Sequence, residues 1–168
     1  VQDPRVRPVS ERWPPMSRSC CASRPELPRR VRIAADFMRL AYALVFVVNV
    51  RCALGYLVST EAFLPTFDAS GEAGLVALRG IGVAFLMWNA TYPAVVWDPV
   101  RFRSLAAVVL VQQVIGLVGE SWIYAGISGA YPALQATIRA FISFDGFGLV
   151  VMLATFVWLE VERRRSAV

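Results

Sequence analysis

Five ionisable side chains lie within stretches of sequence that are otherwise apolar, and these are the side chains best placed to do chemistry. They are Arg51, Arg79, Glu120, Arg139 and Asp145. A charge near the centre of a bilayer costs on the order of 2.5 to 3.5 kcal/mol. At about 1.5 Å per residue, the first four lie roughly 7 to 11 Å from the outer surface of a bilayer and Asp145 lies near its midplane. We therefore expect all five to meet in the protein interior instead of facing lipid.

The chemistry of this predicted cluster favours ligand binding. Three arginines against two carboxylates leave one net positive charge, and a guanidinium binds carboxylate and carbonyl groups in a bidentate geometry. Gln113 precedes Glu120 by seven residues and shares its helix face, so its amide joins the predicted site. The predicted ligand is a small polar or anionic molecule. Two alternatives stay open: the charges form buried ion pairs that fix which helices are neighbours, or the two carboxyl groups transfer protons.

Residue types that enzymes and metalloproteins commonly use are scarce in this sequence. Histidine is absent, so a zinc site built on histidine, an axial haem histidine and a histidine general base are excluded for the chain acting alone. The three cysteines, Cys20, Cys21 and Cys52, show no CxxC spacing. We expect no catalytic residue, no metal and no cofactor. An enzyme that acts on quinones or lipid headgroups through Arg, Glu and Tyr stays an alternative.

The overall composition is typical of a membrane protein. Hydrophobic residues make up 57% of the 168 residues, and the mean hydropathy is +0.55. The formal net charge is +5, and every basic residue is an arginine. Most arginines lie at the ends of apolar segments, whereas a nucleic-acid surface would interleave basic residues along one solvated face. The expected partner is therefore the lipid bilayer, and no nucleic acid is expected.

Four apolar stretches are long enough to cross a bilayer and are predicted to be helices. They cover residues 40–58, 74–97, 105–127 and 134–159. The predicted fold class is an all-α, integral membrane four-helix bundle, with a transmembrane domain over residues 31–162. Pro93 is expected to kink the second helix. The first stretch also resembles a secretory signal peptide, because it is an apolar run after basic residues, but no small-x-small cleavage site follows it.

The two ends of the chain are expected to lie outside this bundle. Residues 1–30 contain six of the ten prolines and seven of the 17 arginines, which predicts a disordered tail. Residues 163–168 are predicted to form a short basic tail. Because the sequence begins with Val1, a different start stays open, with Met16 and Met38 as candidates.

The positions of the arginines also predict how the bundle is oriented. Outside the four apolar stretches, they lie in the N-terminal flank, in the turn at residues 98–104 and at the C-terminal end, whereas the connections after the first and third stretches contain none. The positive-inside rule places such basic segments in the cytoplasm. Both termini are therefore predicted to be cytoplasmic.

Three segments of the chain resemble one family of membrane proteins. They are RGIGVAFLMWNATYP (residues 79–93), VVLVQQVIGLVGES (residues 108–121) and FDGFGLV (residues 144–150). These segments are similar to the BphX-like family of small four-helix bacterial membrane proteins, over roughly residues 33–160. The resemblance implies a multi-pass protein of a bacterial inner membrane. The family has no established activity, so the resemblance implies no catalytic residue.

The function predicted from these observations is the binding, or the onward passage, of a small polar or anionic ligand at the charged cluster. A homo-oligomer is expected, because four helices enclose little room for a pathway. The alternative is an accessory or scaffold subunit of a membrane complex, with no ligand of its own.

Overall fold

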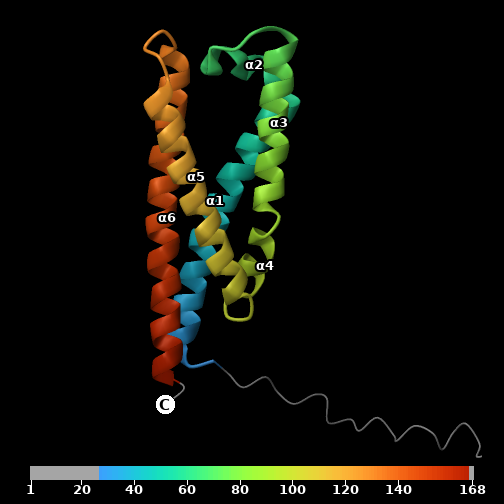
Figure 1. The fold of residues 1–168 in the computed structure, drawn as a ribbon. Helices are drawn as coiled ribbons and strands as arrows, with labels where there is room; N and C mark the ends of the chain where they lie inside the picture. Colours follow the sequence, from blue (N-terminus) through green and yellow to red (C-terminus); the bar gives the residue numbers. More distant parts are fainter. Residues whose placement is uncertain (1–26, 167–168) are drawn as a thin grey trace, which may run out of the picture.

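The computed structural model of the chain describes residues 27–166, and these residues are helical apart from short connections (Figure 1). The helices are α1 (Arg29–Val58), α2 (Thr60–Phe63), the 3-10 helix η3 (Leu64–Phe67), α3 (Gly71–Asn89), α4 (Tyr92–Trp97), α5 (Arg103–Gly126) and α6 (Pro132–Ser166). Four helical segments within residues 27–166 are long and apolar enough to cross a membrane: α1, α3 together with α4, α5, and α6. The predicted all-α class with four such segments is confirmed. Predictions about residues 1–26, which include Met16, Cys20 and Cys21, lie outside the described residues, as do those about residues 167–168.

The first and last helices are longer than the predicted spans. α1 begins at Arg29, inside the segment predicted as a tail, because Val31, Ala34 and Met38 share one buried face of its first turns. α6 continues to Ser166, so the predicted C-terminal tail is helical over residues 163–166. Two ion pairs between side chains three residues apart stabilise this last stretch. They join Arg163 Nη1 to Glu160 Oε1 at 3.2 Å and Arg165 Nη1 to Glu162 Oε1 at 3.4 Å.

The second membrane-length segment is interrupted where Pro93 predicts a kink. α3 ends at Asn89 and α4 begins at Tyr92, with Pro93 in its first turn. Proline has no N–H to donate to the carbonyl four residues earlier, so the preceding helix cannot continue unbroken. Side chains bind the backbone at the break: Asn89 Nδ2 donates to the Phe85 carbonyl at 2.8 Å, and the Thr91 hydroxyl donates to the Trp88 carbonyl at 3.4 Å. The kink is confirmed.

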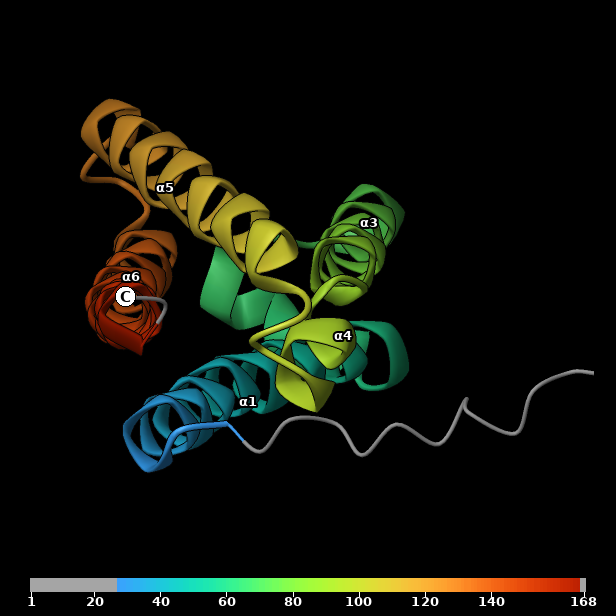
Figure 2. The ribbon, with the colours of Figure 1, turned by 90° about the horizontal axis from the view of Figure 1, so that it is seen from below.

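α1 is the helix on which the others assemble. It packs against α3, α4 and α6, while α5 packs mainly against α6 (Figures 1 and 2). Arg39 holds α4 in place, because its Nε donates to the Val96 carbonyl at 2.8 Å and its Nη2 to the Trp97 carbonyl at 3.2 Å. Both ends of the described chain lie at the same end of the bundle, as expected for four long helical segments that alternate in direction (Figure 1).

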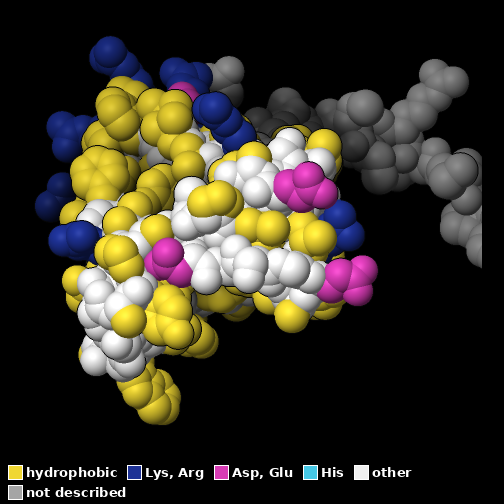
Figure 3. Space-filling view, turned by 90° about the horizontal axis from the view of Figure 1, so that it is seen from above, with side chains coloured by type: hydrophobic (Ala, Val, Ile, Leu, Met, Phe, Trp, Pro, Cys, Tyr) yellow, Lys and Arg dark blue, Asp and Glu magenta, His cyan; other side chains and the backbone are white. Residues whose placement is uncertain are grey.

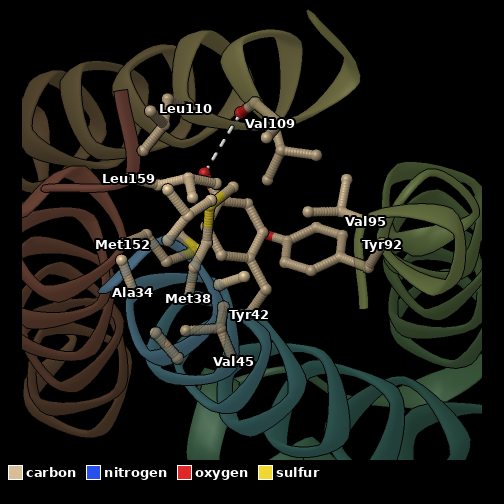
Figure 4. Packing of buried hydrophobic residues seen from close by; sticks show 14 residues of the cluster. Ala34, Met38, Tyr42, Val45, Tyr92, Val95, Val109, Leu110, Met152 and Leu159 are labelled. Carbon is tan, nitrogen blue, oxygen red and sulfur yellow. Dashed lines mark hydrogen bonds between the residues drawn. The ribbon is translucent and has the colours of Figure 1, made fainter. Parts of the chain in front are cut away.

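The buried core lies in the half of the bundle near these two ends, and Figure 4 shows how its side chains pack. It is built from the first half of α1, from α4, from the first turns of α5 and from the second half of α6. Tyr42, Tyr92 and Met152 are 0% exposed, and the Tyr42 hydroxyl donates to the Ala106 carbonyl at 3.2 Å. This half of the molecule is therefore tightly packed.

The opposite end is covered by a structured connection where the sequence predicts a loop. η3 packs against the N-terminal turns of α6, and α2 packs against α1 and α3. Asp68 Oδ2 accepts a hydrogen bond from Leu134 N at 2.9 Å, and the Thr137 hydroxyl donates to the Thr66 carbonyl at 2.6 Å. Tyr56 of α1 packs edge-on against Phe63 and Phe67, with ring centroids 5.0 and 5.6 Å away. Seen from above, acidic and apolar side chains lie on the face toward the viewer, and arginines are visible around the outline of the molecule (Figure 3).

Candidate functional site

A cavity of about 290 Å³ lies between α1, α3, α5 and α6, on the side of the core nearer to η3. Its wall is mainly apolar and includes the rings of Phe85, Trp88, Phe141 and Phe144. The polar residues on the wall are Asn49, Cys52, Asn89, Gln113, Glu120 and Asp145. The cavity is partly open to the outside. Its size is at the lower end of the range for small-molecule sites, and a few polar groups on an apolar wall are typical of them.

The Gln113 side chain of α5 forms hydrogen bonds to two neighbouring helices. Its side chain is 1% exposed. Its Oε1 accepts a hydrogen bond from the Tyr92 hydroxyl at 3.3 Å, and its Nε2 donates to the backbone carbonyl of Asp145 at 3.4 Å. The amide thus links α4, α5 and α6 at the level where the cavity begins. Gln113 belongs to the predicted site, and the structure places it on the cavity wall.

Glu120 of α5 and Asp145 of α6 both line the cavity, as members of the same predicted site. Glu120 Oε2 is buried and has no hydrogen-bond partner among the described residues. Gly116, one turn before Glu120, lets α5 approach its neighbours: a Cβ at this position would lie 3.0 Å from the Trp88 ring and 3.4 Å from Asp145 Oδ2. The structure therefore brings Gln113, Glu120 and Asp145 to one cavity.

Asn89 is a residue of this wall that the sequence does not place in the predicted site. Its side chain is 2% exposed. Its Nδ2 donates a hydrogen bond to the Phe85 carbonyl, but its Oδ1 is buried without a hydrogen-bond partner within residues 27–166. In the sequence, Asn89 reads as an interhelical hydrogen-bond partner, because nothing there shows that it ends a helix beside a cavity. Its position four residues before Pro93 is the signal that could have been used.

The three arginines of the predicted cluster do not reach the cavity. Arg51, Arg79 and Arg139 are exposed and do not line it. Among residues 27–166, the ion pairs are Arg39–Asp36, Arg163–Glu160 and Arg165–Glu162, so the three arginines pair with neither Glu120 nor Asp145. The expectation that all five charges meet in the interior is wrong.

Helix phase and side-chain length explain this error. Arg79 follows the buried Leu78, and Arg139 follows the buried Ile138, so each arginine lies about 100° away from a packed face. A long arginine side chain can run along an apolar surface and place its charge at the boundary with water, so no interior partner is needed. The Arg79 side chain extends toward α2 at the end of the bundle, where its Nε donates to the hydroxyl of Thr60 at 3.4 Å.

Because the three arginines lie outside the cavity, the ionisable groups on its wall differ from those of the predicted site. Two carboxyl groups line the cavity, and no basic side chain of residues 27–166 does so. Within residues 27–166, the buried side-chain nitrogen and oxygen atoms without a hydrogen-bond partner are Asn89 Oδ1 and Glu120 Oε2. The site therefore offers acceptor oxygens and two acidic groups, where the sequence predicted net positive charge.

Comparison of the chain with protein-family models, with curated proteins and with solved structures finds no match. The resemblance to the BphX-like family therefore stays a prediction.

Proposed function

We propose that this chain is a multi-pass membrane protein that binds a small ligand in the cavity between α1, α3, α5 and α6. The observation that carries the proposal is that Asn89 and Glu120, two residues of the cavity wall, each have a buried oxygen, Oδ1 and Oε2, without a hydrogen-bond partner among the described residues. Leaving a buried polar group unsatisfied costs about 1–3 kcal/mol. A ligand that donates hydrogen bonds to these oxygens would recover that free energy on binding.

The outer faces of the helices support the location in a membrane. Large apolar side chains cover them, among which Leu44 is 59% exposed, Val76 68%, Ile115 62% and Val150 65%. Exposure of so extended an apolar surface to water is unfavourable, whereas contact of the same surface with lipid acyl chains is not. Together with the predicted resemblance to bacterial proteins, this supports a place in the bacterial inner membrane.

The distribution of arginines supports an orientation with both ends of the chain in the cytoplasm. Residues 29–39, 98–103 and 160–166 lie at one end of the bundle and contain nine arginines against four acidic residues. The opposite connections contain Glu61, Asp68 and Glu72 and no arginine. Basic segments are retained in the cytoplasm during insertion, so the arginine-rich end is the cytoplasmic one in this proposal.

Single cysteines introduced at the two ends test this orientation. In a background with the native cysteines changed to serine, Ser70→Cys is expected to react with a membrane-impermeant maleimide in intact spheroplasts. Ser104→Cys is expected to react only after permeabilisation, because it lies at the arginine-rich end. Both serines are exposed, so accessibility within the protein is matched. The reverse labelling pattern would overturn the proposed orientation.

Ligand binding in the cavity is tested with 2-phenylethanol, a compound that has an apolar ring and one hydroxyl donor. We expect it to raise the thermal unfolding midpoint of the purified full chain. Ala140 lines the cavity, and the variant Ala140→Phe is expected to abolish this shift by occupying the space. Ala154→Phe is the matched control, because Ala154 is an exposed residue of the same helix that does not line the cavity.

A shift of equal size in wild type and in Ala140→Phe would show that the compound acts on the detergent or elsewhere on the protein, which contradicts the proposal. Absence of a shift in wild type would also contradict it for a ligand of this size. Co-purification of a stoichiometric membrane partner in that case would favour the alternative function, an accessory subunit without a ligand.

A further inference from the structure

We infer that the ligand is a protonated amine joined to an apolar group. This inference rests on the proposed function, because it names the chemical class that the same cavity takes. It departs from the sequence prediction of an anionic ligand, since the arginines on which that prediction depended lie outside the site.

The charges on the wall support a cation. Glu120 and Asp145 come from neighbouring helices and line one cavity, and no basic side chain among the described residues lines it with them. A carboxylate in apolar surroundings is unfavourable unless a positive charge or several donors compensate it. A ligand with an ammonium group supplies that charge, whereas an anionic ligand would add a third negative charge to the same space.

The unpartnered atoms support a ligand that donates hydrogen bonds. Asn89 Oδ1 belongs to α3 and Glu120 Oε2 belongs to α5, so the two acceptors come from different walls of the cavity. The amides of Asn89 and Gln113 each donate one of their two N–H groups to a backbone carbonyl, of Phe85 and Asp145 respectively, so the buried side-chain atoms left without a partner among the described residues are the two oxygens. An ammonium group has three donors and no acceptor, which matches the groups that are left.

The rest of the wall supports an organic cation over a metal ion. Phe85, Trp88, Phe141 and Phe144 surround the carboxyl groups, and an aromatic face attracts an ammonium group. These rings also provide the apolar surface that a hydrocarbon group would cover. Residues 27–166 contain no group of three or more His, Cys, Asp or Glu side chains arranged to hold a metal ion.

The test compares four compounds of similar size on the full chain: 2-phenylethylamine, 2-phenylethanol, phenylacetate and propylbenzene. Their dissociation constants are measured by calorimetry at neutral pH, where the amine is protonated. We expect the amine to bind at least about ten-fold more tightly than the alcohol, which corresponds to about 1.4 kcal/mol. Phenylacetate is expected to bind most weakly.

Two variants show whether the carboxyl groups cause this preference. Glu120→Gln is expected to reduce the preference for the amine over the alcohol to within about three-fold, while binding of the alcohol persists and shows that the cavity is intact. Glu160→Gln is the matched control, because Glu160 pairs with Arg163 away from the cavity, and it is expected to keep the full preference.

The outcomes separate this inference from the proposed function. If the alcohol binds in the cavity as tightly as the amine, or if phenylacetate binds more tightly, the inferred class is overturned and the proposed site stands. An amine preference that survives Glu120→Gln and Asp145→Asn also overturns the inference. If no compound binds to the wild-type chain, the proposed function fails together with the inference.

Discussion

Gly82→Leu is expected to lower the thermal unfolding midpoint of the purified chain markedly. Gly82 is buried where α3 crosses α1, and a Cβ at this position would lie 2.9 Å from Leu57 Cγ and 3.0 Å from the Ala53 carbonyl oxygen. The backbone oxygen cannot move aside, so the two helices must separate. Overpacking of this kind typically costs about 1–3 kcal/mol, and a whole leucine side chain belongs at the upper end.

Gly80→Leu provides the matched control on the same helix. Gly80 is exposed, and a Cβ there would have no atom within 4 Å. The replacement of glycine by leucine in a helix interior is favourable by a few tenths of a kcal/mol up to about 1 kcal/mol, so the midpoint should stay or rise slightly. Equal midpoints for the two variants would show that α3 does not pack on α1 through Gly82.

Met152→Ala is expected to have an effect of similar size in the packed half of the bundle. Met152 is 0% exposed and belongs to the core cluster with Met38 and Leu159. Figure 4 shows these side chains in contact range between α1 and α6. Truncation of a buried methionine to alanine costs about 2–5 kcal/mol, because the packing contacts are lost and a cavity remains.

Leu153→Ala is the control for this substitution, since Leu153 is the next residue on α6 and is 46% exposed. Lipid or detergent replaces the contacts that this leucine loses, so we expect a change below about 1 kcal/mol. The free energy of unfolding is measured for both variants by titration with a denaturing detergent. A larger loss for Leu153→Ala would mean that α6 presents its other face to the bundle.

Hydropathy alone predicted the four membrane-length segments, and the structure contains them. Their length and apolar character are properties of each segment by itself, so no knowledge of neighbours is needed. The kink at Pro93 was predictable for the same reason, because a missing N–H is a local property. The ends of α1 and α6 were less predictable, since side-chain burial at residues 31–38 and the ion pairs of the last turns extend them beyond the apolar stretches.

The site was only partly predictable, because the rotation of each helix about its axis decides which side chains face the cavity. Gln113 and Glu120 share a face by their spacing, and both line the cavity. The sequence predicts that Arg79 and Arg139 lie at a similar depth to Glu120, but depth does not fix the direction of a side chain around the helix axis. The cost of a charge in lipid argued for interior pairing, yet arginine avoids that cost by reaching toward the boundary. Asn89 was missed because its unsatisfied oxygen is visible only in three dimensions.

The contrast between the two halves of the bundle determines how a bound molecule can leave. On α1, α5 and α6, the residues that line the cavity are followed, toward the arginine-rich end, by the core that includes Tyr42, Val109 and Met152. These three side chains are 0% exposed, so this packed core closes the cavity on the side of the arginine-rich end. A molecule in the cavity therefore has no open path through this core toward the arginine-rich end. A single copy is suited to capture and release, and passage toward that end would require the core to open.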